Sequence, residues 1–350
     1  MSALPAAAVT RLSAILPAPG TWTTNYRPPP RFDTASFDSY RPNDPTQVTA
    51  LERVRSFAAG IGPVARRRIL LPWGRPAVRG PRGLYLDGAF GVGKTHLLAA
   101  VWHAAKDVPR AYLSFQELVY LTGAMGIARA REELKGLRLL CLDEFELDDP
   151  GNTLIIKTLL QTLFEQGASV VTTSNTSAEA QGQGRFNAED FAREIQGIAA
   201  YFEPVPLAGP DYRLRAGQHR DPALPEAIAA EPGDGVVEAD WAELGGVLRE
   251  LHPVAYGSML EPVATLYLHG LDTIRSQADA LRFVHFIDRI YDRRVKLRFS
   301  AAPGLRGDLR ELFHPSYRNS AYVKKHDRCI SRLRELLSEA DVALTAGQPA

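Results

Sequence analysis

This sequence contains few cysteines and no long apolar run. Its only cysteines are Cys141 and Cys329, so at most one disulfide can form, which excludes the disulfide-rich class of small secreted proteins. Such sparse cysteine usage is typical of a reducing compartment. No apolar run reaches the about 18–20 residues that a membrane-spanning helix needs, and no transmembrane segment is predicted.

The chain also lacks an excess of either charge. Lys plus Arg number 41 against 40 for Asp plus Glu, which gives a formal net charge of +1 and an isoelectric point of 7.8. A strongly basic nucleic-acid domain, with an isoelectric point above about 9, is therefore disfavoured, and a protein substrate is favoured over nucleic acid. Apolar residues make up 45% of the 350 residues, which is enough for a sizeable core and indicates two compact units.

Acidic residues are absent from the first 32 positions, where three arginines occur. The weakly apolar stretch Ala3–Val9 lacks the charged start and the apolar centre of a secretory signal. A transit peptide, which is also poor in acidic residues, remains an alternative. We favour a flexible N-terminal tail over residues 1–30.

Short apolar runs alternate with amphipathic segments along the middle of the chain. A helix is predicted to begin at Pro45, behind the capping residue Asp44, with Gln47 reaching back, and to stop near Gly60. Buried strands are predicted at residues 84–86, 137–142 and 168–174, and helices at 95–106 and 153–166. This alternation predicts an α/β fold, a parallel-sheet core over residues 31–215 with helices on both faces.

The remaining third of the chain has a different pattern. Residues 216–236 belong to a stretch that is rich in Gly, Pro, Ala and Glu and has no periodicity, so a linker is predicted there. Beyond it, apolar spacing predicts a helix around 280–291, a strand at 295–299 and a final helix around 329–337. We therefore predict a mainly helical, lid-like C-terminal part over residues 237–350 that completes the core.

One segment matches the phosphate-binding motif G-x-x-x-x-G-K-[ST] at every fixed position. It consists of Gly88, Ala89, Phe90, Gly91, Val92, Gly93, Lys94 and Thr95. Its glycines let backbone N–H groups turn toward phosphate oxygens, and the helix that follows points its N-terminus at the same anion. Lys94, one of only seven lysines among the 41 basic residues, is expected to reach the β- and γ-phosphates, and Thr95 to ligate Mg²⁺. The predicted ligands are ATP and Mg²⁺.

Two further strand ends supply the polar groups that hydrolysis needs. Asp143, at the end of an apolar run, is predicted to hold Mg²⁺ through water, and Glu144 to act as the general base. Cys141, inside the same run, is interpreted as a core residue rather than a nucleophile. Asn175 ends the next predicted strand and is expected to orient the attacking water near the γ-phosphate.

With these three elements in order, the sequence resembles an AAA+ P-loop ATPase, and more narrowly the ZapE family of bacterial cell-division ATPases and their mitochondrial relatives. The resemblance covers residues 30–338. Its segments are RF…Y.P (31–42), LLCLDEFELDDP (139–150), VVTTSN (170–175), DYRLR (211–215), ALRFVHFIDRIYDRRVKL (280–297) and CISRLREL (329–336).

The resemblance implies further roles and partners. Asn175 corresponds to the family's sensor-1 residue, and either Arg185 or Arg193 to the arginine that acts on a neighbouring subunit's nucleotide in a homo-oligomer. Arg282 corresponds to a sensor-2 contact with the nucleotide. The implied location is the bacterial cytoplasm at the division site, with the division-ring protein FtsZ as partner and peripheral membrane association left open.

The sequence departs from the family pattern at His96–Leu98, at Tyr112–Phe115 and at Asp148–Asn152, which suggests a divergent bacterial branch. Two alternatives belong to other classes of protein. A helicase-loader-like nucleic-acid accessory ATPase shares the G-K-T-H-L form of the motif, but the balanced charge disfavours it. A nucleotide-binding scaffold without turnover is disfavoured by the intact Glu144.

Overall fold

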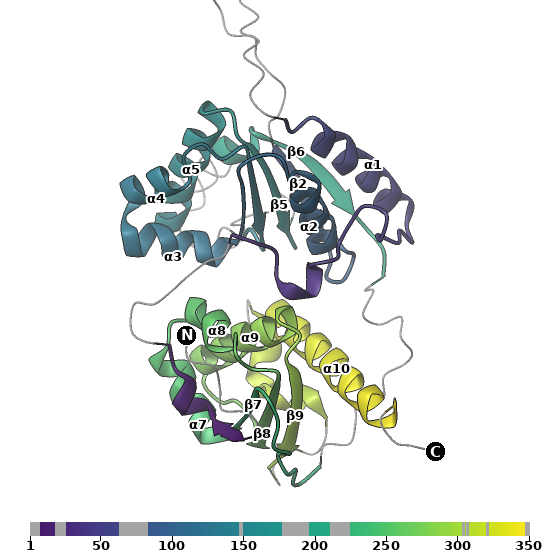
Figure 1. The fold of residues 1–350 in the computed structure, drawn as a ribbon, viewed down its shortest axis with the longest axis vertical. Helices are drawn as coiled ribbons and strands as arrows, with labels where there is room; N and C mark the ends of the chain where they lie inside the picture. Colours follow the sequence, from purple (N-terminus) through teal and green to yellow (C-terminus); the bar gives the residue numbers. More distant parts are fainter. Residues whose placement is uncertain are drawn as a thin grey trace, which may run out of the picture. The chain divides into compact units, whose positions relative to one another are not determined.

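The computed structural model describes residues 8–17, 26–62, 83–146, 150–176, 196–210, 225–302, 305, 308–319 and 322–346. The chain divides into two compact units (Figure 1). The central unit comprises Thr24–Pro28 and Phe32–Tyr212. The terminal unit, which includes both chain ends, comprises Met1–Thr23, Pro29–Arg31 and Arg213–Ala350.

The central unit is built on a five-stranded sheet in the order β3-β4-β5-β2-β6, and every pair in it is parallel. Its strands are β2 (Gly83–Gly88), β3 (Arg110–Ser114), β4 (Leu139–Asp143), β5 (Ser169–Ser174) and β6 (Phe202–Leu207). Parallel neighbours need crossover connections, which helices provide. These helices are α1 (Pro45–Ala59), α2 (Lys94–Ala104), α3 (Phe115–Met125), α4 (Ile127–Glu133) and α5 (Pro150–Glu165).

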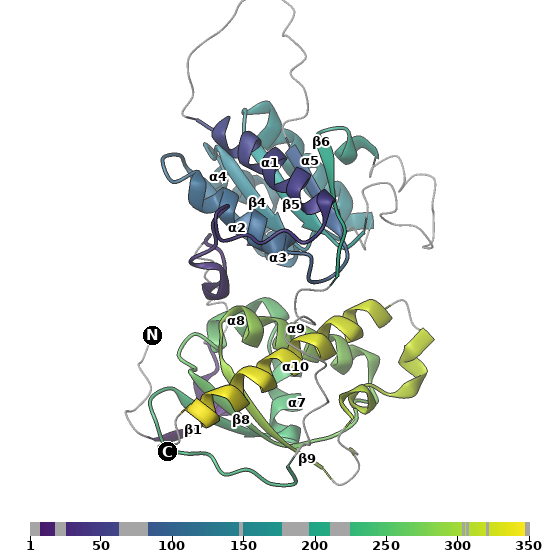
Figure 2. The same cartoon turned by 90° about the vertical axis from the view of Figure 1, so that its right-hand side faces the viewer.

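Helices cover both faces of this sheet. Figures 1 and 2 show α1 and α2 on one face and α3, α4 and α5 on the other. All five residues of β4 are buried, as a strand covered on both faces requires. The predicted parallel-sheet α/β core is confirmed.

The start of α1 follows the expected capping chemistry with one difference. The Asp44 side chain accepts a hydrogen bond from the Thr46 amide at 2.8 Å, and Pro45 occupies the first turn. The Gln47 side chain reaches back to the Asn43 amide at 2.8 Å, rather than to the cap residue itself. It also donates to the Ala208 carbonyl at 2.7 Å, so this one side chain ties α1 to the end of β6.

The terminal unit has its own four-stranded parallel sheet, in the order β1-β7-β8-β9. Its strands are β1 (Val9–Arg11), β7 (Val236–Asp240), β8 (Thr265–Leu271) and β9 (Lys296–Ala301). Its helices are α7 (Trp241–Glu250), α8 (Tyr256–Met259), α9 (Gln277–Asp292) and α10 (Val323–Ala346). Short 3-10 turns lie at Leu12–Ile15, Pro30–Phe32, Pro253–Ala255, Leu309–Leu312 and Pro315–Asn319. The helices predicted around 280–291 and 329–337 are present as α9 and α10. The strand predicted at 295–299 corresponds to β9, and the sequence did not indicate the other three strands of this sheet.

The N-terminal segment differs from the flexible tail expected over residues 1–30, because part of it forms the edge strand β1. Leu12 is fully buried in the terminal unit's core. Arg11 donates to Asp240 at 2.6 Å and also pairs with Glu243. A strand of three residues is too short to produce a recognisable alternation in the sequence. Long-range packing and ion pairing therefore fix this segment.

Within the described residues, no helix is long and apolar enough to cross a membrane. Of the predicted linker 216–236, only residues from 225 onward are described.

Candidate active site

The loop between β2 and α2 contains the predicted phosphate-binding motif. Gly91 and Gly93 have positive φ values of 68° and 92°, a region that L side chains rarely adopt. At Gly93 a Cβ would lie 2.5 Å from the Tyr40 ring, and at Gly88 it would overlap the Leu207 carbonyl oxygen. The motif's glycines are thus required by backbone conformation and by close packing.

Lys94 begins α2 and turns its ammonium back over the loop. Its Nζ donates to the carbonyl oxygens of Gly88 and Ala89 at 2.7 Å each and to Asn175 Oδ1 at 3.0 Å. The residue is only 8% exposed. The structure therefore brings the phosphate-binding loop and Asn175 together. They follow strands β2 and β5, which are neighbours in the sheet.

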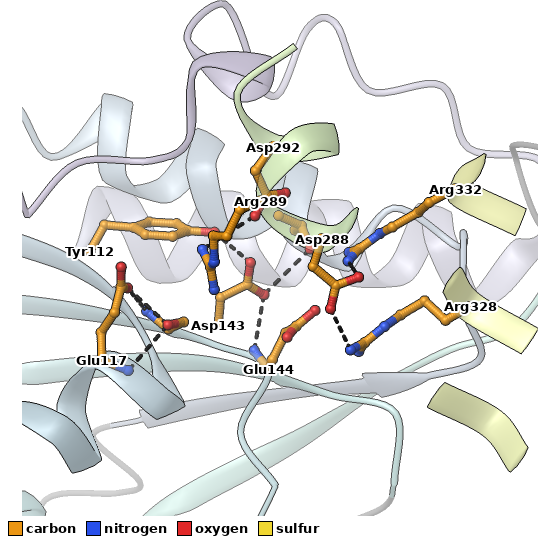
Figure 3. A network of polar contacts seen from close by, with 11 residues as sticks. Tyr112, Glu117, Asp143, Glu144, Asp288, Arg289, Asp292, Arg328 and Arg332 are labelled. Carbon is orange, nitrogen blue, oxygen red and sulfur yellow. Dashed lines mark hydrogen bonds and ion pairs between the residues drawn. The ribbon is translucent and has the colours of Figure 1, made fainter. Parts of the chain in front are cut away.

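Asp143, at the end of β4, is the centre of a polar network (Figure 3). Its Oδ2 accepts from the Tyr112 hydroxyl at 2.7 Å, and its Oδ1 accepts from the Thr173 hydroxyl and from the Glu144 amide. The Thr95 hydroxyl lies 3.4 Å from Oδ1. Strand register explains this convergence, because β3, β4 and β5 are successive parallel neighbours whose carboxyl ends meet at one edge.

Glu144 directly follows this strand in a left-handed conformation, with φ of 55°. For a residue other than glycine this conformation costs about 1–3 kcal/mol and is found at functional sites. The Glu144 amide donates to Asp143 Oδ1 at 3.1 Å and to the Thr173 hydroxyl at 3.0 Å, and these bonds hold the turn. The Asn175 side chain donates to Glu146 Oε1 at 3.3 Å.

The oxygen donors at this edge suit Mg²⁺, which prefers carboxylate and hydroxyl oxygens. Thr95 and Asp143 present one of each, so the residues present fit the predicted metal. Cys141 is fully buried in β4, and burial raises the pKa of its thiol well above its usual value. Its interpretation as a core residue is confirmed.

The structure does not test the roles expected of three arginines. Arg185 and Arg193 lie outside the described residues. Arg282 belongs to α9 of the terminal unit, where its guanidinium lies 3.6 Å from Asp279. Asp279 also accepts from Arg249, and this hydrogen bond is the largest cause that lowers the Asp279 pKa. The nucleotide contact of Arg282 stays a prediction.

Sequence reasoning missed three hydroxyl groups that the structure places against the site, those of Tyr40, Tyr112 and Thr173. Thr173 was within the quoted VVTTSN segment, and its position two residues before Asn175 was a usable signal. Tyr40 lies in the quoted segment 31–42 and Tyr112 in the departure at Tyr112–Phe115. Both are distant in sequence from the groups that they contact, so only folding shows those contacts.

The strand order β3-β4-β5-β2-β6, with this loop after β2 and the acidic pair after β4, defines a P-loop ATPase fold of the AAA+ class. A family model described as AFG1-like ATPase matches residues 23–227 and 226–344. This chain therefore belongs to the AFG1-like ATPase family.

Known proteins of similar sequence include a bacterial and a yeast protein. Cell division protein ZapE of Escherichia coli K12 is 24% identical over 310 residues, covering 74% of this chain and 78% of the relative. Uncharacterized protein C115.02c of Schizosaccharomyces pombe is 22% identical over 336 residues, covering 74% and 73%. The resemblance to the ZapE family is confirmed.

Solved structures that resemble the chain cover about half of it. DnaI is 22% identical and covers 51% of this chain and 90% of its own, with a TM-score of 0.40. The DnaC helicase loader is 20% identical and covers 51% and 99%, with a TM-score of 0.38.

Proposed function

We propose that this chain is an ATP-hydrolysing AAA+ protein remodeller of the ZapE type that acts in bacterial cell division on the FtsZ ring. The main support is one observation. Lys94, Asp143 and Asn175, from three sequence-distant segments, converge at the carboxyl edge of one parallel sheet within a network of hydrogen bonds. Family membership adds that relatives of this chain are ATPases.

In this proposal the loop amides and Lys94 bind the β- and γ-phosphates. Three of the oxygens that the Lys94 ammonium contacts belong to two neutral carbonyls and one neutral amide. Phosphate oxygens are charged and therefore stronger acceptors, so the ammonium exchanges these partners for the nucleotide. The exchange frees Asn175 Oδ1, which then accepts from the attacking water.

Thr95 and Asp143 hold Mg²⁺, which when bound neutralises charge on the phosphate oxygens. Glu144 accepts the proton of the attacking water as general base. Its left-handed backbone is held by hydrogen bonds from its amide to Asp143 and Thr173. This backbone conformation fixes the direction in which the Glu144 side chain leaves the chain. Water attacks the γ-phosphorus, the bond to the bridging oxygen breaks, and ADP and phosphate leave.

The remaining parts of the proposal come from the family. An arginine supplied by a neighbouring subunit, Arg185 or Arg193, stabilises charge on the transferring phosphoryl group in a homo-oligomer, and Arg282 contacts the nucleotide. The relative from Escherichia coli is named a cell division protein, which supports a division role. FtsZ as substrate, a cytoplasmic location and peripheral association with the membrane at the division site belong to this proposal.

The catalytic part is tested by two substitutions in the full chain. Lys94→Ala is expected to abolish nucleotide binding. Glu144→Gln is expected to retain ATP binding but to lower phosphate release about a hundredfold or more, because it removes the general base. Glu165→Gln, an exposed carboxylate at the end of α5, is the matched control and should hydrolyse normally. The proposal is wrong if the unaltered protein, under oligomer-favouring conditions and with candidate partners, releases no more phosphate than Lys94→Ala.

FtsZ as partner is tested with Glu144→Gln, which is expected to bind ATP without hydrolysing it. Glu144→Gln loaded with ATP is mixed with purified FtsZ polymers and sedimented, with Lys94→Ala as the control that binds no nucleotide. ATP-dependent co-sedimentation supports the division role, and its absence contradicts FtsZ as substrate. Submicromolar DNA binding that weakens steeply with salt would instead favour the helicase-loader-like alternative.

A further inference from the structure

Tyr40 contacts the phosphate-binding loop from a segment 52 residues earlier in the chain. It lies just before α1 and is 6% exposed. Its hydroxyl donates a buried hydrogen bond of 2.8 Å to the Val92 carbonyl oxygen. Its ring lies directly against Gly93, where a Cβ would come within 2.5 Å of the ring carbon Cε2.

The bond to Val92 controls the direction of the next amide. The peptide between Val92 and Gly93 is planar and trans, so its C=O and N–H point to opposite sides. With the carbonyl oxygen held on the Tyr40 side, the Gly93 N–H must point away from Tyr40. In this motif the loop N–H groups are the phosphate donors. A reversed peptide would present a carbonyl oxygen to the anion instead.

Reversal is a real alternative at this position because Gly93 has no side chain. Glycine adopts positive and negative φ about equally well, and Gly93 has φ of 92° and ψ of 18°. The local sequence therefore permits more than one orientation of this peptide. A contact from outside the loop is needed to select one.

The segment that carries Tyr40 is itself fastened to the first turn of α2. His96 Nε2 lies 3.0 Å from the Ser39 hydroxyl and 3.0 Å from the Ser36 carbonyl oxygen. The His96 ring is tilted against the Tyr40 ring, with centroids 5.5 Å apart. Tyr40 is thus supported on the helix whose N-terminus completes the loop.

We propose that Tyr40 is a positioning residue for nucleotide binding, whose hydroxyl fixes the Val92–Gly93 peptide so that the Gly93 N–H faces the phosphates. This proposal rests on the proposed function of the loop. It assigns to Tyr40 an effect on the affinity for phosphates, since the fixed amide donates equally to ATP and to ADP. It assigns no effect on the hydrolytic step.

The test is Tyr40→Phe in the full chain, which keeps the ring against Gly93 and removes only the hydroxyl. Tyr256→Phe is the matched control, because Tyr256 donates a comparable buried bond of 2.7 Å to the Leu248 carbonyl in the terminal unit. Affinity for ADP, KM for ATP, kcat and the melting temperature are measured for both. Loss of one hydrogen bond predicts an ADP affinity about three- to tenfold weaker in Tyr40→Phe, with KM raised equally and kcat within about twofold.

The control separates positioning from simple anchoring. Tyr256→Phe should lower the melting temperature but leave the ADP affinity unchanged. If Tyr40→Phe also lowers only the melting temperature, Tyr40 is merely an anchor and the proposal is wrong. A second readout uses ¹⁵N-glycine labelling, in which the Gly93 amide signal should broaden in free Tyr40→Phe because the peptide now samples both orientations, and an unchanged signal contradicts the proposal.

A failure of the proposed function can be distinguished from a failure of the role proposed for Tyr40. If Lys94→Ala binds ADP as tightly as the unaltered chain, the loop is not the nucleotide site, whatever Tyr40→Phe does. If Lys94→Ala loses binding and Tyr40→Phe does not, only the role of Tyr40 is refuted.

Discussion

The carboxylate of Asp143 is fixed by hydroxyl groups from both neighbouring strands. Tyr112 of β3 donates to one oxygen and Thr173 of β5 to the other. These bonds set the rotamer in which Oδ1 lies near Thr95, where the metal is proposed to bind. Partners that orient metal-binding groups in this way commonly change metal affinity by about ten- to a hundredfold when removed.

Tyr112→Phe is therefore expected to raise the Mg²⁺ concentration needed for half-maximal nucleotide binding by about tenfold. The measurement is ADP binding titrated over Mg²⁺ concentration. Tyr26→Phe is the control, since Tyr26 also donates to a carboxylate, that of Glu133, in the same unit but at an exposed position. An unchanged Mg²⁺ dependence in Tyr112→Phe would show that the bonds to the other Asp143 oxygen suffice to orient the carboxylate.

At the level of elements, α9 and α10 are joined by a buried ion cluster (Figure 3). Asp288 of α9 accepts from Arg328 at 2.7 Å and pairs with Arg332, both on α10. The Asp288 and Arg328 side chains are 3% and 4% exposed. Asp288 and Arg332 lie in the segments 280–297 and 329–336 that carry the family resemblance, so this ion pair joins the two segments in the folded unit.

Asp288→Asn is expected to lower the unfolding free energy of the terminal unit by about 3–5 kcal/mol, because it removes the carboxylate that pairs with the buried Arg328 and the partly buried Arg332. Arg249→Gln breaks the exposed pair with Asp279 in the same unit and should cost at most about 1 kcal/mol. Chemical denaturation of the full chain compares them. Equal losses in the two variants would mean that the cluster contributes no more than a surface pair.

At the level of the whole molecule, each unit has its own hydrophobic core and one fully buried cysteine. Cys141 lies in the central unit and Cys329 in the terminal unit. Burial raises the pKa of both thiols well above the usual value. Each thiol therefore stays protonated and inaccessible at neutral pH until its own unit opens.

Saturating nucleotide is expected to slow the labelling of Cys141 far more than that of Cys329. A ligand at 100 times its Kd stabilises the state that binds it by about 2.7 kcal/mol, which is about a hundredfold in the opening equilibrium. Pulsed alkylation with mass spectrometry of the two cysteine peptides, with and without MgADP, measures both rates. Equal slowing at the two sites would show instead that the units unfold as one.

The strands that the sequence predicted in the central sheet are mainly apolar or β-branched. β4 and β5 are buried, continuous apolar or β-branched runs, so their composition alone indicated central strands. β6 was missed because Pro204 and Pro206 interrupt it, which an edge strand tolerates. β7 and β8 contain the polar residues Glu238 and His269, which pair with each other at 3.3 Å in the folded unit.

The sequence by itself determined the phosphate-binding loop and the acidic pair after β4, because those groups are contiguous and covalent spacing fixes their chemistry. Only the tertiary structure decided which hydroxyls orient Asp143, which side chain holds the Val92 carbonyl, and that Val9–Arg11 joins a sheet with Val236–Asp240. Those contacts join residues tens to hundreds of positions apart. They depend on strand order and on side-chain packing within each unit, and no local pattern in the chain encodes either.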